Sequence, residues 1–139
     1  NVPGIAGFGV AAREAREKYR SIGRVGYLIG ILESRARVAV PDAVVFGGKV
    51  PRIANTSLIA LPGVDAETQV MALDLAGISG SAGAACSSGK VGESHVLRAM
   101  GIGEELGKCA IRVSLGFENT IEEVDKFVAV WSGLKKRVV

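Results

Sequence analysis

Apolar residues recur at helical spacing among charged residues in the first part of the chain. This pattern predicts a long helix over residues 5–37, with a break near Gly23 or Gly26 because glycine weakens a helix interior. The positions that carry the pattern are Phe8, Ala12, Ala15, Tyr19, Ile22 and Leu28.

Three apolar stretches bounded by glycine or proline predict strands. Residues 56–61 form a compact apolar run that stops at Pro62, and residues 109–115 form a second run of the same kind. A shorter run at residues 44–46 ends at two glycines and predicts a strand or the edge of a turn.

Residue types at the helix ends predict three further helices. Asp65 is a favourable N-cap for a helix over residues 65–75. Residues 92–100 predict a short helix, followed by a glycine that can take the left-handed conformation. A threonine and a glutamate three residues apart form a capping box ahead of a helix over residues 120–134. The apolar face of that helix consists of Ile121, Val124, Val128 and Trp131.

Strands therefore alternate with helices, and we expect a single α+β (α/β) domain. The expected small sheet contains residues 54–61, 77–82 and 109–115. The helices at residues 65–75 and 120–134 should cover one side of it, with the long N-terminal helix alongside.

The composition favours a soluble domain over a membrane protein or a nucleic-acid-binding protein. The chain has 139 residues, and 48% of them are hydrophobic, enough to fill one core. A net charge of +3 from scattered basic residues and 5% aromatic residues argue against a nucleic-acid partner. No long apolar run or signal peptide is present, so we expect a cytoplasmic protein without a membrane partner. The first residue is Asn1 rather than Met, which suggests a processed chain or a fragment.

Cys86 is the candidate for chemistry because small residues surround it. Chain of this composition loses much entropy on ordering, so it tends to move. A thiol that travels between two sites needs this freedom and must also ionise to the nucleophilic thiolate. We therefore expect residues 83–91 to be exposed or poorly ordered. The alternative is a small buried residue in a tight turn, and we expect burial for Cys109, which precedes an apolar strand. The small residues are Gly77, Ser79, Gly80, Ser81, Gly83, Ser87, Ser88 and Gly89.

Three other motifs are weaker candidates. Residues 83–90 resemble a phosphate-binding loop, but its glycines are one residue too far apart and Val91 replaces the hydroxyl residue that would bind magnesium. The glycines within residues 101–107 miss the dinucleotide-binding spacing by one residue. His95 could act as a base for Cys86, but a lone histidine in a short helix is more typical of a packing or surface residue.

The stretch GISGSAGAACSSGKVGESHVLRAMG, followed by IRVSLG and TIEEVDKFV, resembles the C-terminal part of cysteine desulfurases. The similarity extends to NVPGIAGFGVAAREA and ANTSLIALPGVDAETQVMALDLAGI, so it covers most of the chain. Cysteine desulfurases are fold-type-I enzymes that use pyridoxal phosphate and supply sulfur for iron–sulfur clusters. The resemblance implies that this chain is the small domain of such an enzyme.

The resemblance also implies roles for two residues. The catalytic cysteine of the family falls on Cys86, and the arginine that binds the substrate carboxylate falls on Arg112 in IRVSLG. Pyridoxal phosphate acts as the electron sink while the Cys86 thiolate attacks the sulfur of L-cysteine, which leaves a persulfide and L-alanine. The implied partners are the large domain, a second subunit of a homodimer, and a sulfur-acceptor or iron–sulfur scaffold protein.

One feature of the family is missing from the sequence. The cofactor lysine of the family follows a histidine in the large domain, whereas here the only histidine, His95, is followed by Val96. We therefore expect residues 1–139 to be the small domain without the large one, with no pyridoxal phosphate bound and no activity alone. A stand-alone persulfide carrier or regulatory module is the alternative, and it would keep Cys86 without needing Arg112. A nucleotide-binding module would rest only on the imperfect glycine spacings.

Overall fold

A four-stranded antiparallel sheet lies at the centre of the part of the chain that this computed structural model describes, residues 1–82 and 94–138. β2 and β4 pair along their whole length, from Thr56 opposite Ser114 to Ala60 opposite Ala110. The predicted strands are confirmed, although only the last two residues of the 77–82 segment form one. The strands, in the spatial order β1-β2-β4-β3, are β1 (Val44–Phe46), β2 (Thr56–Ala60), β3 (Ser81–Ala82) and β4 (Ala110–Ser114).

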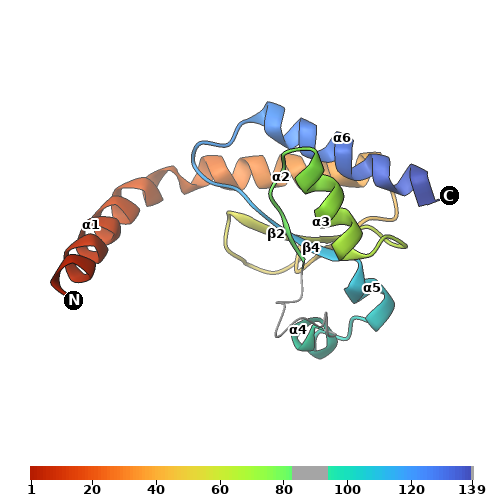
Figure 1. Cartoon of the computed structure of the whole chain (residues 1–139), viewed down its shortest axis with the longest axis horizontal. Helices are drawn as coiled ribbons and strands as arrows, with labels where there is room; N and C mark the ends of the chain where they lie inside the picture. Colours follow the sequence, from red (N-terminus) through yellow and green to blue (C-terminus); the bar gives the residue numbers. More distant parts are fainter. Residues whose placement is uncertain (83–93, 139) are drawn as a thin grey trace.

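The N-terminal helix is broken just ahead of Gly23, as predicted. A 3-10 turn, η1 (Tyr19–Ser21), separates α1 (Val2–Lys18) from α2 (Ile22–Ala39). The expectation of one apolar face that packs alongside the sheet is wrong for α1, which buries no residue and projects away from the sheet (Figure 1). The reason is that the described sheet extends only beneath α2.

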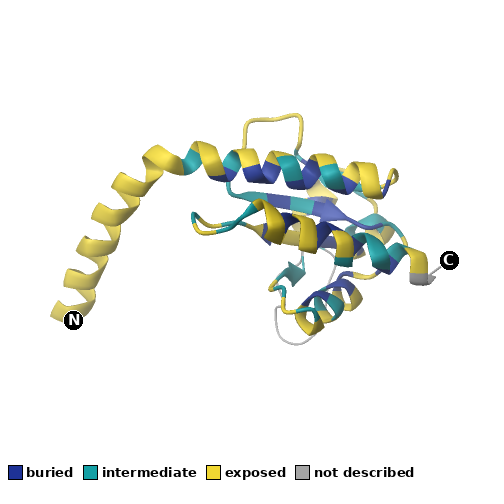
Figure 2. Ribbon diagram, turned by 90° about the horizontal axis from the view of Figure 1, so that it is seen from above, coloured by how far each residue is buried: buried dark blue, intermediate teal, exposed yellow. Residues whose placement is uncertain are grey.

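Three helices cover one face of the sheet, namely α2, α3 (Ala66–Leu75) and α6 (Ile121–Val138). α2 and α6 lie side by side over the strands, and their buried side chains point inward (Figure 2). Ile59 and Ile111, both 0% exposed, pack against Leu32 and Trp131 in this layer. The predicted cover by α3 and α6 is therefore confirmed, and α2 is the part of the N-terminal helix that completes it.

The opposite face of the sheet, for which the sequence made no prediction, is covered in part. Two short helices, α4 (His95–Ala99) and α5 (Glu104–Lys108), pack on the opposite face (Figure 1). Leu97 from α4 contacts the cluster that contains Ala60 and Ala110. The sequence did not predict α5, because five residues are too few to show a helical period. These short helices cover one end of this face and leave the other end open.

The N-terminal signals of the helices are confirmed in part. Asp65 occupies the N-cap position of α3, but its side chain accepts no hydrogen bond from the helix. The capping box of α6 is present: the Thr120 N–H donates to Glu123 Oε2 at 3.0 Å, and the Glu123 N–H donates to Thr120 Oγ1 at 3.3 Å.

The apolar face of α6 is one residue shorter than predicted. Val124, Val128 and Trp131 are buried, but Ile121 is 37% exposed because it lies in the first turn, at the margin of the core. Gly101 has a φ of 75° just after α4, as its position predicts. Among the described residues, no helix combines the length and the apolarity needed to cross a membrane.

Candidate substrate site on the open face of the sheet

Arg112 lies in the middle of β4, directly opposite Leu58 of β2 and Ser81 of β3. Residues opposite one another in antiparallel strands project to the same face of a sheet. Ile111 and Val113 belong to the core under the helices. Since neighbouring residues alternate between faces, Arg112 projects to the face that carries α4 and α5.

The two ends of this face differ around Arg112. Toward the start of β4, Ala110 is 0% exposed beneath the short helices. Toward its end, Ser114 is exposed, and its Oγ lies 3.1 Å from Thr56 Oγ1. Arg112 therefore lies at the border between a covered apolar area and an open area with hydroxyl groups, where a small polar ligand could reach its guanidinium.

The charge of Arg112 is not matched by any residue in the described ranges, since its side chain makes no hydrogen bond or ion pair with them. Other arginines of the domain differ in this respect. Arg35 is paired with Asp125, and Arg52 is paired with Glu33. A planar guanidinium that is exposed and unmatched on a rigid strand is suited to binding a carboxylate by two parallel hydrogen bonds.

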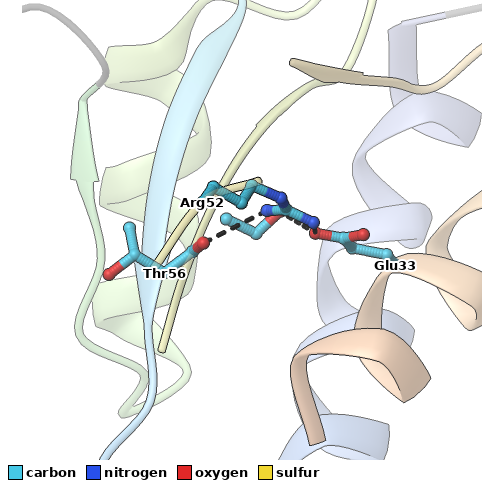
Figure 3. A network of polar contacts seen from close by, with 4 residues as sticks. Glu33, Arg52 and Thr56 are labelled. Carbon is cyan, nitrogen blue, oxygen red and sulfur yellow. Dashed lines mark hydrogen bonds and ion pairs between the residues drawn. The ribbon is translucent and has the colours of Figure 1, made fainter. Parts of the chain in front are cut away.

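A buried polar network holds β2, the neighbour of β4, against α2. Glu33 is 8% exposed, and its Oε1 accepts hydrogen bonds from Ser57 Oγ at 2.6 Å and from Arg52 Nη2 at 2.5 Å. Arg52 Nη1 also donates to the Thr56 carbonyl at 3.2 Å (Figure 3). The network fixes the start of β2, and thereby the strand that pairs with Arg112. Sequence reasoning missed it, although an acidic residue on the apolar stripe of α2 was a signal that a buried partner exists.

A second set of contacts holds the loop that leaves β4. Arg24 donates to the carbonyl oxygens of Phe117 and Asn119 at 2.7 and 2.9 Å. Asn119 Oδ1 accepts from the Gly116 N–H at 2.6 Å, which closes the turn. Hydrogen bonds from the Asn119 amide and from the backbone N–H of Thr120 hold the pKa of the Glu123 carboxyl below its usual range. The end of the strand is thus tied to both α2 and α6.

Cys86, and with it the segment expected to be exposed or poorly ordered, lies outside the described residues. The chain on both sides of it is described. Ala82 is opposite Ile111, one residue from Arg112, and α4 packs on the same face of the sheet as Arg112. Ala82 packs against the core on the helix-covered face, whereas α4, where the described chain resumes, lies on the Arg112 face.

The remaining sequence candidates have structural positions. Cys109 is 4% exposed and its Sγ donates to the Glu105 carbonyl at 3.3 Å, so its predicted burial is confirmed. His95 is exposed at the start of α4, which fits a surface residue. The glycines within residues 101–107 follow α4 rather than a strand, which is not the setting of a dinucleotide-binding motif.

The lysines in the described ranges do not fit a site for pyridoxal phosphate. A lysine that forms a covalent bond with the cofactor must react as the uncharged amine. It therefore needs an enclosed position, where burial lowers the pKa of the amine. Lys108 is instead paired with Glu104, and Lys135 is paired with Asp42. The others are exposed on the surface, namely Lys18, Lys49, Lys126 and Lys136. The described residues therefore include an arginine whose chemistry suits a carboxylate but no lysine that fits the cofactor.

Comparisons with known proteins identify the family of this chain. Residues 30–127 match the family described as aminotransferase class-V. A cysteine desulfurase of Cereibacter sphaeroides is 42% identical over 130 residues, which cover 94% of this chain and 33% of that relative. A cysteine desulfurase of Klebsiella pneumoniae is 36% identical over 129 residues, which cover 93% of this chain and 32% of that relative.

A solved structure shows the same arrangement of elements. The NifS-like protein from Rickettsia africae superimposes with a TM-score of 0.85 and 31% sequence identity, over 98% of this chain and 35% of that one. These similarities confirm the resemblance to cysteine desulfurases and the expected fold class. The chain spans about a third of the length of the relatives that it matches.

Proposed function

Because the chain belongs to the aminotransferase class-V family, we propose that it forms the C-terminal part of a cysteine desulfurase. The longer protein, called here the parent polypeptide, would convert L-cysteine to L-alanine and leave the sulfur on Cys86 as a persulfide. The observation that carries the proposal is the exposed Arg112, which makes no ion pair with the described residues and lies on the same face as α4, where the described chain resumes after Cys86.

Arg112 would bind and orient the substrate. Its guanidinium can form a bidentate pair with the carboxylate of L-cysteine, and charge-assisted hydrogen bonds of this kind contribute about 1.5–3 kcal/mol. The pairing between β2 and β4 and the anchors near the end of β4 hold the backbone of Arg112 in place, so little backbone entropy is lost on binding.

Cys86 would accept the sulfur as a thiolate. A sulfur–sulfur bond forms between Cys86 and the substrate while the carbon–sulfur bond of the substrate breaks. The electron pair of the broken bond stays on the carbon, and a proton completes the methyl group of alanine. L-cysteine and a thiol thus give L-alanine and a persulfide, so no outside oxidant or reductant is needed. Pyridoxal phosphate supplies the electron sink for this chemistry in the family.

The cofactor would be held by the large domain that precedes this chain in the parent polypeptide, since the described lysines do not fit it. We expect the chain alone to be inactive for this reason. The parent would act as a cytoplasmic homodimer and pass the sulfur to an acceptor or an iron–sulfur scaffold protein. A free-standing persulfide carrier is the second candidate, and it would need Cys86 but not the unmatched charge of Arg112.

The test is the site of persulfide formation. The parent polypeptide is incubated with L-cysteine, digested under non-reducing conditions and analysed by mass spectrometry, with Cys109 as the internal control. The added sulfur atom should appear on the peptide that contains Cys86 and be absent from the peptide that contains Cys109. Sulfur on neither cysteine, or on Cys109 alone, would refute the proposal.

A further inference from the structure

A pair of hydroxyl groups lies near Arg112 on the open face of the sheet. Thr56 of β2 is directly opposite Ser114 of β4, and Thr56 Oγ1 lies 3.1 Å from Ser114 Oγ, so one hydroxyl donates to the other. Ser114 follows Arg112 by two residues on the same strand, so both side chains project to the same face, about 6.5–7 Å apart along the strand. A ligand bound to Arg112 is therefore close to these hydroxyl groups.

The backbone holds this pair in a fixed position. The Leu115 N–H donates to the Asn55 carbonyl at 2.9 Å, just beyond the Thr56–Ser114 pair. Thr56 and Ser114 are therefore a non-hydrogen-bonded pair, the kind in which opposite side chains approach more closely. The Thr56 carbonyl also accepts a hydrogen bond from Arg52 at 3.2 Å, which ties the start of β2 to the buried network of α2. Because this backbone is already ordered, a ligand can bind here at little cost in backbone entropy.

The two hydroxyl groups have hydrogen-bonding capacity that the described chain does not use. Each hydroxyl has one proton and two lone pairs, and the bond between them uses only one proton. In the described ranges, neither hydroxyl has another hydrogen-bond partner. Ser114 is exposed, so its proton can reach a ligand. A carboxylate has about four acceptor sites and a bidentate guanidinium fills two of them, which leaves room for a further donor.

We propose that Ser114 is a second substrate-binding residue beside Arg112. Its hydroxyl donates to the carboxylate of the amino-acid substrate, while Thr56 donates to Ser114 Oγ and so orients it. This inference rests on the proposed function, since it assumes that Arg112 binds the same carboxylate. Thr56 does not touch the substrate and is a positioning residue. A chain of hydrogen bonds in which each hydroxyl donates to the next strengthens the last donor.

The alternative role for the pair is purely structural. Cross-strand threonine and serine pairs stabilise sheets, and such a pair would only strengthen the contact between β2 and β4. A structural pair would not distinguish a ligand that has a carboxylate from a ligand that lacks one. The two roles therefore predict different results when the ligand is varied together with the side chain.

The test compares L-cysteine with cysteamine, which is L-cysteine without its carboxylate. The parent polypeptide with pyridoxal phosphate is titrated with each ligand, and binding is measured by the change in cofactor absorbance. Ser114→Ala should weaken the binding of L-cysteine about 10-fold and leave the binding of cysteamine unchanged. Ser114→Thr keeps the hydroxyl and should bind L-cysteine within about 3-fold of the unsubstituted protein. Thr56→Val should cause a smaller loss than Ser114→Ala, again for L-cysteine only.

Ser132→Ala is the matched control. Ser132 lies on α6, over the other face of the sheet, where its Oγ donates to the Ala129 carbonyl at 3.4 Å. This substitution should leave both titrations unchanged. An equal loss for L-cysteine and cysteamine in Ser114→Ala, or no loss for L-cysteine, would overturn the inference.

Arg112→Ala separates this inference from the proposed function. If Arg112→Ala weakens the binding of L-cysteine and Ser114→Ala does not, the role of Ser114 is refuted and the proposed function stands. If neither substitution weakens the binding of L-cysteine, both the role of Ser114 and the carboxylate site of the proposed function are refuted.

Discussion

The two faces of the sheet are built for different tasks. On one face, α2, α3 and α6 cover Ile59, Ile111 and Val113, none of which is more than 7% exposed. On the other face, two helices of five residues cover only one end, and Arg112 stays exposed. The long helices give the domain its core, while the short ones leave an open area where a ligand can bind. Under the proposed function, stability and substrate binding would therefore depend on alternate residues of the same strand.

The polar groups of the two faces differ in the same way. On the helical face, Gln69 is 0% exposed, and its amide donates to the carbonyls of Val64 and Cys109 at 2.7 and 2.8 Å. Its Oε1 accepts from Trp131 Nε1 at 2.8 Å. Every polar atom of this buried side chain has a partner, as burial requires. Arg112 on the open face has no such partner among the described residues, so its hydrogen-bonding capacity is free for a ligand.

The largest loss of stability should follow removal of the central side chain on the helical face. Trp131→Ala should lower the free energy of unfolding of the 139-residue chain by about 3–5 kcal/mol, because it opens a cavity and leaves Gln69 without one partner. Urea unfolding measures the change. Trp131→Phe, which keeps a ring but not the N–H, should lose clearly less. A loss below about 1 kcal/mol for Trp131→Ala would mean that this layer is not the core.

Neighbouring substitutions on β4 sharpen the comparison. Ile111→Ala should lower the free energy of unfolding by about 2–5 kcal/mol, whereas Arg112→Ala should change it by no more than about 0.5 kcal/mol. Ile111 is fully buried and Arg112 is exposed. Urea unfolding of both variants gives the two changes in the free energy of unfolding. Equal losses would show that the open face is packed as tightly as the helical one.

The smallest expected effect concerns a surface ion pair and its dependence on pH. The hydrogen bond from Lys135 to Asp42, at 2.7 Å, holds the pKa of the Asp42 carboxyl below its ordinary value of 3.8. A lowered pKa contributes stability that is present above pH 3.8 and is lost as the pH falls through the pKa of the folded state. Asp42→Asn should remove this part of the acid sensitivity and lower stability at neutral pH by less than about 1 kcal/mol. Unfolding midpoints of the unsubstituted protein and of Asp42→Asn, measured across this pH range, check the prediction. If stability falls equally with decreasing pH in both proteins, the ion pair does not contribute to the acid sensitivity.

The sequence predicted most element positions, but not the contacts that hold them. The alternation of Ile111 and Val113 with Arg112 and Ser114 is the signal in the sequence that corresponds to the observed position of the arginine, on the opposite face from the core. The partners of Glu33 and Arg24 could not be predicted, because they depend on how α2 crosses the strands and on a loop about 90 residues away. α1 shows the other limit: the pattern predicted its helix but not that the helix buries no residue in the described domain.

The central claim is that Cys86 and Arg112 act at different steps, and substitution of each in the parent polypeptide tests it most directly. Binding of L-cysteine is measured by the change in cofactor absorbance, and product formation is measured as the amount of L-alanine. Cys86→Ala should bind L-cysteine normally and form no alanine, since it lacks only the sulfur acceptor. Arg112→Ala should bind L-cysteine roughly 10–100-fold more weakly, because a charge-assisted contact to the carboxylate is lost. Normal alanine formation by Cys86→Ala, or an unchanged L-cysteine titration for Arg112→Ala, would contradict the account.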